Sequence, residues 1–230
     1  ALPIAILVHS VTAWIFGLEI AKEGWYSAIM APIFVASACD SGLALLMVVL
    51  AAVRKAGVFD CGRELFANLA RLLATFIAVD AFFIGCELLT TAYPGTEGAS
   101  HVLGIMTSGA TAPFFWFEIL GGLLIPFVLL ASAKRRECTG VVVAASALVM
   151  CGVFCKRVWL LFTSFTVTNV YGAPGISSGS TAARGADGFD MWALAGSYMP
   201  QPVEFAVVAA VVSFCILGIA LLSKKLVAKA

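Results

Sequence analysis

Six long apolar segments constrain this chain more than any other feature of its sequence. Each holds the roughly 20 mostly apolar residues that an α-helix needs to cross a bilayer. They are Leu2–Ile20, Ser27–Val53, Leu65–Thr91, Pro113–Ala133, Val141–Val170 and Pro202–Leu222. Backbone groups in lipid must be hydrogen-bonded internally, and the alternating pattern of barrel strands is absent. The segments therefore predict an all-α, polytopic transmembrane helix bundle forming one domain over residues 1–230, with Gly121, Gly122 and Pro126 bending the fourth helix or bringing it close to a neighbour.

Composition supports a membrane protein and removes several other classes. Of the residues, 62% are hydrophobic and 12% charged, against roughly 25% charged in an ordinary soluble domain. The formal net charge of +1 provides no basic field for nucleic acid, so membrane lipids are the expected surroundings. The seven cysteines include no C-x-x-C pair, and there are only two histidines. We therefore expect neither an iron–sulfur cluster nor a haem bound by this chain alone.

The basic residues predict the orientation of the bundle. If the helices alternate in direction, nine lysines and arginines fall on one side and only Lys22 and Arg184 on the other. The nine are Arg54, Lys55, Arg63, Lys134, Arg135, Arg136, Lys224, Lys225 and Lys229. The positive-inside rule makes their side cytoplasmic, in the cytoplasmic membrane of a prokaryote, with both visible chain ends on that side. The loops Thr91–Ala112 and Tyr171–Gln201 then face outward, and the second could be a flexible lid or a surface that docks a partner.

Ten ionisable residues lie inside the apolar segments, where each costs about 3 kcal/mol on insertion scales. They are His9, Glu19, Asp40, Arg71, Asp80, Glu87, Glu118, Lys156, Arg157 and Glu204. By count along the helices, His9, Asp40 and Asp80 lie near mid-depth. Such groups usually face the bundle interior or water, so a line of them across the membrane suits proton movement.

Several of these residues also allow a plainer interpretation. Lys156 and Arg157 could neutralise buried carboxylates such as Asp80 or Glu118. Glu19 and Glu204 lie close enough to the outer surface to be solvated, and His9 could be hydrogen-bonded between helices. Near Asp40, the hydroxyls of Ser37 and Ser41 are placed to hydrogen-bond a carboxylate.

The residues alone favour one function and leave two others open. Protonatable groups in apolar surroundings, without a redox centre in the chain, suit a diffusible redox carrier such as a quinone, which exchanges protons together with electrons. A proton- or ion-coupled transporter could use the same charges without redox chemistry. A passive anchor for an extracytoplasmic enzyme would need no charges at mid-membrane.

Four motifs resemble the NrfD/PsrC (polysulfide reductase) family of membrane subunits. HSVTAWIF begins at His9 and GWYSAIMAPIFVASA at Gly24, and both lie in the first half of the chain. FWFEILGGLLIPF begins at Phe115 and resembles the family pattern F-W-x-E-x-x-x-G-x-x-I-P. YMPQPVE ends at Glu204 and resembles Y-x-P-x-x-x-E. The resemblance extends over nearly the whole chain. Within the family the DsrP type, associated with sulfite reduction, is the most similar, but polysulfide-, tetrathionate- or nitrite-reducing systems and alternative complex III share much of this pattern.

The resemblance implies a haem-free, quinone-reactive subunit of a respiratory oxidoreductase complex. Such subunits pass electrons between menaquinone and a ferredoxin-like partner that carries [4Fe–4S] clusters, with linked proton transfer and further subunits in the complex. Members usually have eight to ten membrane helices, so we expect the six here to be the C-terminal part of that fold, with an even number preceding Ala1. The terminal donor or acceptor, the direction of electron flow and any proton pumping are left undetermined.

The resemblance also assigns roles to particular residues. It implies that His9 and Asp40 are catalytic and contact the quinone, with Thr12, Trp14 and Ser37 beside them. Glu118 and Glu204 match glutamates of the family motifs, and Arg157 resembles a basic residue of the family. Asp80 and Glu87 share one helix face, and we expect them to carry protons along the bundle together with Glu118, Arg157 and Glu204. Around Arg157 the sequence departs from the family pattern, because an R-x-N followed by G-Q is not present.

Overall fold

The computed structural model describes residues 2–20, 24–57, 62–165 and 201–227. These residues form helices and turns, with no β-strand within those ranges, as an all-α bundle requires. The helices are α1 (Leu2–Gly17), α2 (Met30–Lys55), α3 (Arg63–Ala92), α4 (Glu97–Ser108), α5 (Ala112–Trp116), η1 (Phe117–Leu124), α6 (Ile125–Ala131), α7 (Ala133–Arg136), α8 (Thr139–Phe165) and α9 (Pro202–Val227). Residues 171–200 of the second outer loop lie outside the described ranges.

Five helical segments in the described ranges are long and apolar enough to cross a membrane. They are α2, α3, the combined α5–η1–α6, α8 and α9. The protein is therefore an integral, multi-pass membrane protein. The sixth predicted span, Leu2–Ile20, forms a shorter apolar helix, because α1 ends at Gly17. Its 16 residues rise about 24 Å, less than the hydrocarbon core of about 30 Å.

Helix α1 ends at Gly17, beside the segment that leads into α2. A side chain at Gly17 would place its Cβ 2.8 Å from the Ser27 carbonyl oxygen, so the two segments meet without space for one. Gly24 supplies the turn with φ of 85°, in the left-handed region that glycine adopts at little cost. The indole Nε1 of Trp25 then donates a hydrogen bond of 2.9 Å to the Leu160 carbonyl and fixes the turn against α8.

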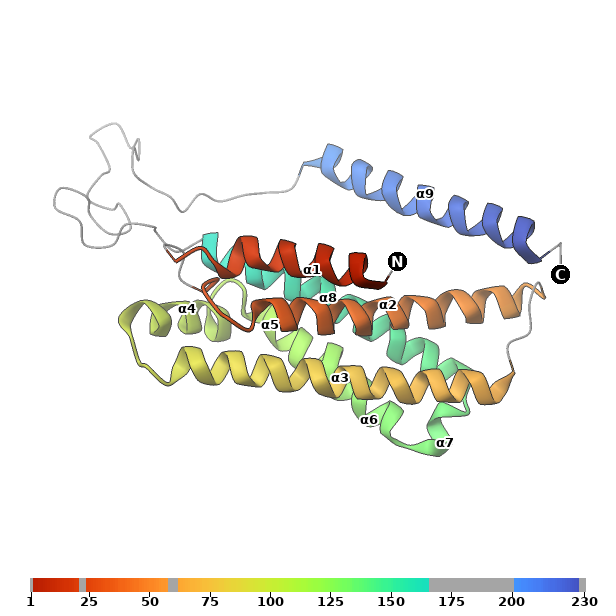
Figure 1. The fold of residues 1–230 in the computed structure, drawn as a ribbon, viewed down its shortest axis with the longest axis horizontal. Helices are drawn as coiled ribbons and strands as arrows, with labels where there is room; N and C mark the ends of the chain where they lie inside the picture. Colours follow the sequence, from red (N-terminus) through yellow and green to blue (C-terminus); the bar gives the residue numbers. More distant parts are fainter. Residues whose placement is uncertain (1, 21–23, 58–61, 166–200, 228–230) are drawn as a thin grey trace.

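The long helices alternate in direction, which is the condition under which the basic residues gather at one end (Figure 1). The carboxyl ends of α2 and α9, the amino end of α3 and the short α7 lie at one end of the bundle, and they carry the basic residues. The opposite end holds α4, a helix inside the loop that sequence analysis left unassigned. Its Thr96 caps it by accepting a hydrogen bond from the Ala99 N–H at 3.4 Å.

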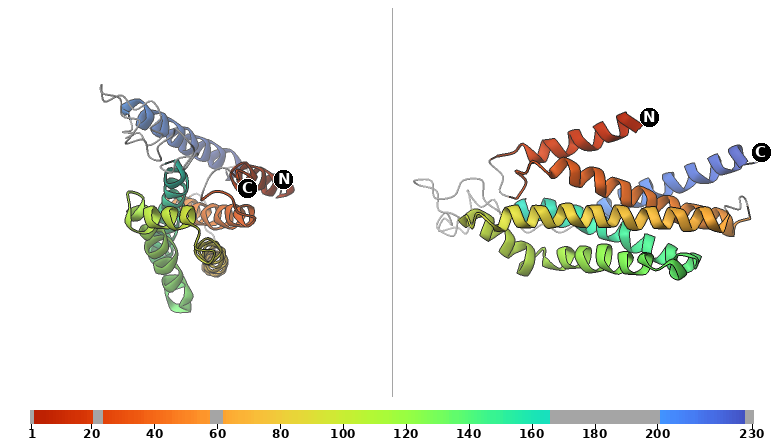
Figure 2. Two further views of the ribbon diagram at one scale, coloured as in Figure 1. Left: turned by 90° about the vertical axis from the view of Figure 1, so that its left-hand side faces the viewer. Right: turned by 60° about the horizontal axis from the view of Figure 1, so that its bottom comes forward.

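The main hydrophobic core lies among α2, α3, α6, η1 and α8. Figure 2 shows α9 standing apart from these helices. The buried residues of this hydrophobic core come from the five packed helices. They are Ala44, Met47, Phe66, Ala70, Leu73, Ala74, Ile77, Ile84, Leu123, Leu130, Val142, Ala145 and Val149. By contrast, no residue of α9 between Pro202 and Leu222 is buried.

The fourth span is distorted where the sequence predicted a bend. A π-helix replaces the α-helix over Phe117–Leu124. It ends two residues before Pro126, whose nitrogen has no hydrogen to donate to the i−4 carbonyl and whose ring clashes with the preceding turn. Gly122 also lies against Gly152 of α8, so that a Cβ added at Gly122 would stand 2.6 Å from the Gly152 Cα. The two glycines thus let η1 and α8 approach backbone to backbone.

Because η1 and α8 are in backbone contact at Gly122, adding a methyl group there should destabilise the protein. Gly122→Ala should lower the free energy of unfolding by about 1–3 kcal/mol, because neither backbone can yield without separating the helices. Thermal unfolding of the purified protein in detergent measures this change. Gly42→Ala is the matched control, since a Cβ there meets open space. An equal midpoint for both variants would contradict the prediction.

Candidate functional site

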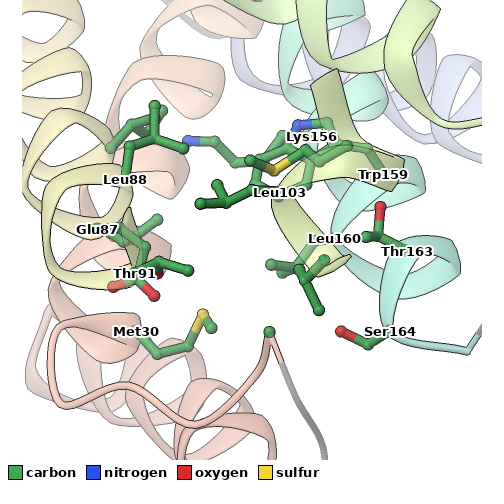
Figure 3. A pocket seen from close by; sticks show the side chains of 15 residues that line it. Met30, Glu87, Leu88, Thr91, Leu103, Lys156, Trp159, Leu160, Thr163 and Ser164 are labelled. Atoms are coloured by element: carbon green, nitrogen blue, oxygen red, sulfur yellow. The ribbon is translucent and has the colours of Figure 1, made fainter. Parts of the chain in front are cut away.

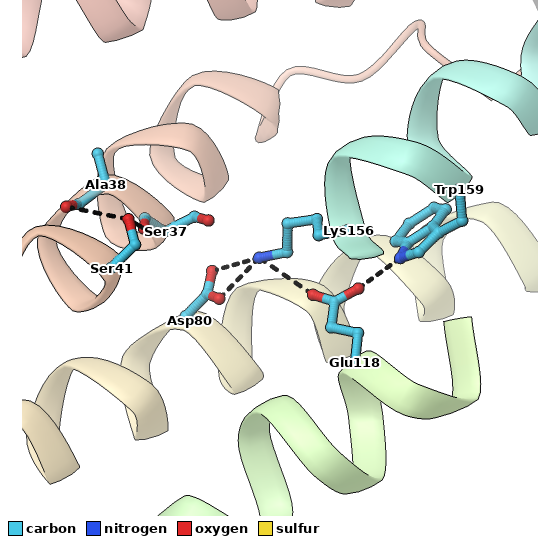
Figure 4. A network of polar contacts seen from close by, with 7 residues as sticks. All are labelled: Ser37, Ala38, Ser41, Asp80, Glu118, Lys156 and Trp159. Atoms are coloured by element: carbon cyan, nitrogen blue, oxygen red, sulfur yellow. Dashed lines mark hydrogen bonds and ion pairs between the residues drawn. The ribbon is translucent and has the colours of Figure 1, made fainter. Parts of the chain in front are cut away.

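A network of buried charges crosses the middle of the bundle from three helices (Figure 4). The ammonium of Lys156 on α8 lies 2.9 and 2.7 Å from the two carboxylate oxygens of Asp80 on α3. The same nitrogen lies 3.3 Å from Oε1 of Glu118 on η1. All three side chains are at most 3% exposed. One cation therefore binds two carboxylates away from solvent, which is the structural pairing that sequence analysis had left as an alternative.

Glu118 is held on its other side by Trp159, whose indole Nε1 donates a hydrogen bond to Oε2. The Trp159 ring packs edge-on against Phe115, with ring centroids 5.6 Å apart and an interplanar angle of 84°. Trp159 follows Lys156 by three residues, so both side chains leave the same face of α8. This spacing was the available sequence signal for Trp159, which sequence analysis missed.

Asp40 on α2 adds a third carboxylate to this network. It is fully buried, and Asp80 and Lys156 are its charged neighbours. Neither of its oxygens has a hydrogen-bonding partner in the described part of the chain. The bonds expected from Ser37 and Ser41 are not formed: the Ser41 hydroxyl donates to the Ser37 carbonyl at 2.6 Å, and the buried Ser37 hydroxyl has no partner among the described residues.

Asp40, Asp80, Glu118 and Lys156 together are called the ionic cluster below. It contains three carboxylates and one ammonium, while Arg157 lies nearby with its guanidinium carbon 4.0 Å from the centre of the Phe34 ring. Asp80 also acts electrostatically on Arg157. Even with both cations counted, fully ionised carboxylates leave an excess negative charge in a dry interior. Because unpaired buried charge is very costly, the cluster is suited to hold a proton.

A cavity lies beside the ionic cluster, between the amino end of α2, the carboxyl ends of α3 and α8, and α4 (Figure 3). This central cavity is lined mainly by apolar side chains. They include Met30, Ile33, Ile84, Leu88, Val102, Leu103, Met106 and Leu160. The polar lining comes from Glu87 and Thr91 on α3 and from Lys156, Trp159, Thr163 and Ser164 on α8. Mostly apolar walls with a few polar groups are typical of a small-molecule site.

Two residues connect the central cavity to other polar groups. Lys156 lines the cavity and also forms the ion pairs of the ionic cluster, so a ligand in the cavity lies next to that cluster. Glu87 is half-buried and accepts a hydrogen bond from the Ser27 hydroxyl. It also lines a second hollow, with Tyr26, Ser27 and Thr96, toward the end of the bundle that carries α4.

The structure does not bring the α1 residues to the cavity wall. His9 is half-buried, with Nδ1 2.9 Å from the Ala5 carbonyl oxygen of its own helix. The Thr12 hydroxyl donates to the Val8 carbonyl at 2.8 Å, and Trp14 is 49% exposed. Glu204 is exposed near the start of α9. Of the residues predicted for the site, Asp40, Asp80 and Glu118 are therefore gathered in the ionic cluster, and Glu87 lies at the cavity.

Comparison with known proteins agrees with the resemblance carried by the motifs. The profile of the family described as polysulphide reductase, NrfD, matches residues 1–169. The chain belongs to the NrfD family.

Within the described ranges, no group of three or more histidine, cysteine, aspartate or glutamate residues is arranged to hold a metal ion.

Three relatives are named as subunits of reductases or oxidoreductases. A putative dimethyl sulfoxide reductase membrane subunit of Halobacterium salinarum is 36% identical over 214 residues, 93% of this chain and 48% of that protein. A selenate reductase subunit of Mesobacillus selenatarsenatis is 30% identical over 80% of this chain and 42% of its own. The Hdr-like menaquinol oxidoreductase integral membrane subunit of Archaeoglobus fulgidus is 27% identical over 68% and 40%. The chain thus spans less than half the length of each relative.

The ion pairs of Lys156 predict a large effect of removing its charge. Lys156→Met should lower the free energy of unfolding by about 3–5 kcal/mol, because the buried carboxylates of Asp80 and Glu118 lose their cation. Adding Asp80→Asn should restore part of the loss. The thermal midpoint in detergent measures both effects. Lys55→Met, at the exposed end of α2, is the control and should change stability by less than about 0.5 kcal/mol; a similarly small effect of Lys156→Met would refute the pairing.

Proposed function

We propose that this chain is a quinone-reactive membrane subunit of a prokaryotic respiratory oxidoreductase complex. The observation that carries the proposal is the central cavity. Its walls are mostly apolar but also contain Glu87 and Lys156, and Lys156 is ion-paired to Asp80 and Glu118. Membership of the NrfD family supports it, as does a relative named as a menaquinol oxidoreductase subunit.

The residues of the cavity fit the chemistry of a quinone. When bound, a quinone supplies a two-electron, two-proton couple on an apolar ring with two oxygens. Trp159 and the aliphatic side chains would bind and orient such a ring, and they exclude water. The Glu87 carboxyl would provide a hydrogen-bonding and proton-exchanging group at the wall. The Lys156 side chain also lines the wall, while its ammonium is paired with Asp80 and Glu118. Menaquinone is the form that we propose, from the named relative.

Protons have two candidate routes away from the cavity. Glu87 lies at the hollow that opens toward the α4 end, where Ser27 orients its carboxyl. On the other side, Lys156 connects the cavity to the ionic cluster, which can take up a proton because of its excess of carboxylates. Arg157 is proposed as a further member of this path, because it lies within electrostatic reach of Asp80. Glu204 on α9 is proposed as a peripheral member of the path.

The complex and its place in the cell follow as proposals. The relatives are named as subunits of reductases or oxidoreductases, and we propose a ferredoxin-like [4Fe–4S] subunit as the electron-carrying partner. The basic end of the bundle would face the cytoplasm, which puts the central cavity toward the outer face of the cytoplasmic membrane. The DsrP type stays a prediction within the family.

Glu87 provides the sharpest test of the cavity. Glu87→Gln keeps the shape of the side chain but cannot exchange a proton, so menaquinol oxidation by the purified complex should fall by about 10²-fold or more. Glu19→Gln is the matched control, because Glu19 is exposed and does not line the cavity. Normal turnover of Glu87→Gln would remove this residue from the reaction.

His9 remains a predicted catalytic residue, and its position on α1 makes a separate test possible. His9→Ala should abolish quinol-linked activity while the complex stays assembled, if the imidazole exchanges protons with the quinone as the family resemblance implies. Ser10→Ala, at the next position, is the control. Full activity of His9→Ala together with a defect in Glu87→Gln would place the chemistry at the cavity alone.

A transporter would use the ionic cluster without any redox step. Purification distinguishes the two functions: an iron–sulfur partner whose absorption bleaches on addition of menaquinol supports the proposal. Substrate flux in liposomes that hold this protein, without quinol oxidation, would instead support a proton- or ion-coupled transporter.

A further inference from the structure

A groove on the surface of the bundle lies next to the central cavity and shares two lining residues with it. Ile84 and Leu88, one turn apart on α3, line both the cavity and this groove. The groove runs between α3 on one side and η1 and α6 on the other, and has a volume of about 500 Å³. Figure 3 shows Leu88 at the edge of the cavity, next to Glu87 on the same helix. These two aliphatic side chains therefore separate a polar-lined interior from the lipid-facing surface.

The groove differs chemically from the cavity that it adjoins. Ala78, Ala81 and Gly85 form its α3 wall, and Ile119, Leu123 and Phe127 form the opposite wall. The described residues that line it carry hydrocarbon side chains or none, without a charge or a hydrogen-bonding group. From Leu88 to Ile77 the groove follows about 16 Å of α3, at 1.5 Å per residue. It can therefore hold an extended hydrocarbon chain but not a polar head group.

We propose that this groove binds the polyprenyl tail of the quinone and that Ile84 and Leu88 form the opening through which the tail leaves the central cavity. The inference rests on the proposed function, since it requires a quinone head group in that cavity. A molecule that occupies both spaces needs a compact polar ring joined to a long hydrocarbon chain, which is the chemistry of a polyprenyl quinone. A phospholipid fits less well, because its charged head belongs at the membrane surface.

Gly85 allows the groove to be filled without disturbing the fold. It is exposed on α3, and a Cβ built there meets no atom within 4 Å. Gly85→Leu and Gly85→Phe therefore add bulk to the groove in two steps. Gly42→Phe is the matched control, because Gly42 is also an exposed mid-helix glycine with open space around it, on α2 and away from the groove.

The experiment compares two substrates of the purified complex: a polyprenyl menaquinol and menadiol, which has the same ring without a tail. Filling the groove should raise the KM for the polyprenyl substrate about tenfold in Gly85→Phe and less in Gly85→Leu. The KM for menadiol should stay at the wild-type value in both variants. Gly42→Phe should resemble the wild type with both substrates.

The other outcomes overturn the proposal in distinguishable ways. Unchanged KM values for both substrates in Gly85→Phe would show that the tail lies elsewhere. An equal rise for both would show that the variant acts on the ring site and not on a tail groove. If the wild-type complex oxidises neither substrate, the proposed function itself fails.

A second measurement does not depend on a folded variant. A menaquinone analogue with a photoreactive diazirine in its tail should label the peptides that contain residues 77–88 and 119–127 of the wild-type complex. Labelling confined to other helices would contradict the groove assignment.

Discussion

The pairing of Lys156 with Asp80 and Glu118 is the constraint on which the rest of this structure depends. An ammonium or a carboxylate alone at this depth would be strongly destabilising, so each group requires the others. The pairing joins α8 to α3 and to η1, and thereby ties the distorted fourth span to the core. Trp159 completes the arrangement by donating to the second oxygen of Glu118.

The distortion of the fourth span belongs to the same design. Pro126 and the glycine pair before it favour a π-helix over Phe117–Leu124, and Gly122 lets this segment touch Gly152 of α8. Glu118 lies in the first turn of the π-helix, close enough to α8 for its carboxylate to reach Lys156. Residues with no functional group of their own therefore set the position of a buried charge.

The proposed function joins two environments of opposite character. The ionic cluster is buried, charged and rich in carboxylates, whereas the groove between α3 and α6 is lined by hydrocarbon alone. The central cavity lies between them and shares Lys156 with the first and Ile84 and Leu88 with the second. An amphipathic redox carrier has the same division, with a proton-exchanging ring and an apolar tail, and one relative is named as a menaquinol oxidoreductase subunit.

The sequence by itself determined the class of the protein, because an apolar segment of bilayer length favours a membrane helix whatever it packs against. The basic residues indicated the orientation of the helices, and short motifs indicated the family. The sequence also indicated which buried charges matter. Only the tertiary structure decided which of them meet: Lys156 was one of two possible cations, and Trp159 gave no signal beyond its spacing. His9 and Asp40 were expected together, yet only Asp40 lies in the ionic cluster. A side chain's partners depend on helix rotation and crossing, which packing sets and periodicity does not reveal.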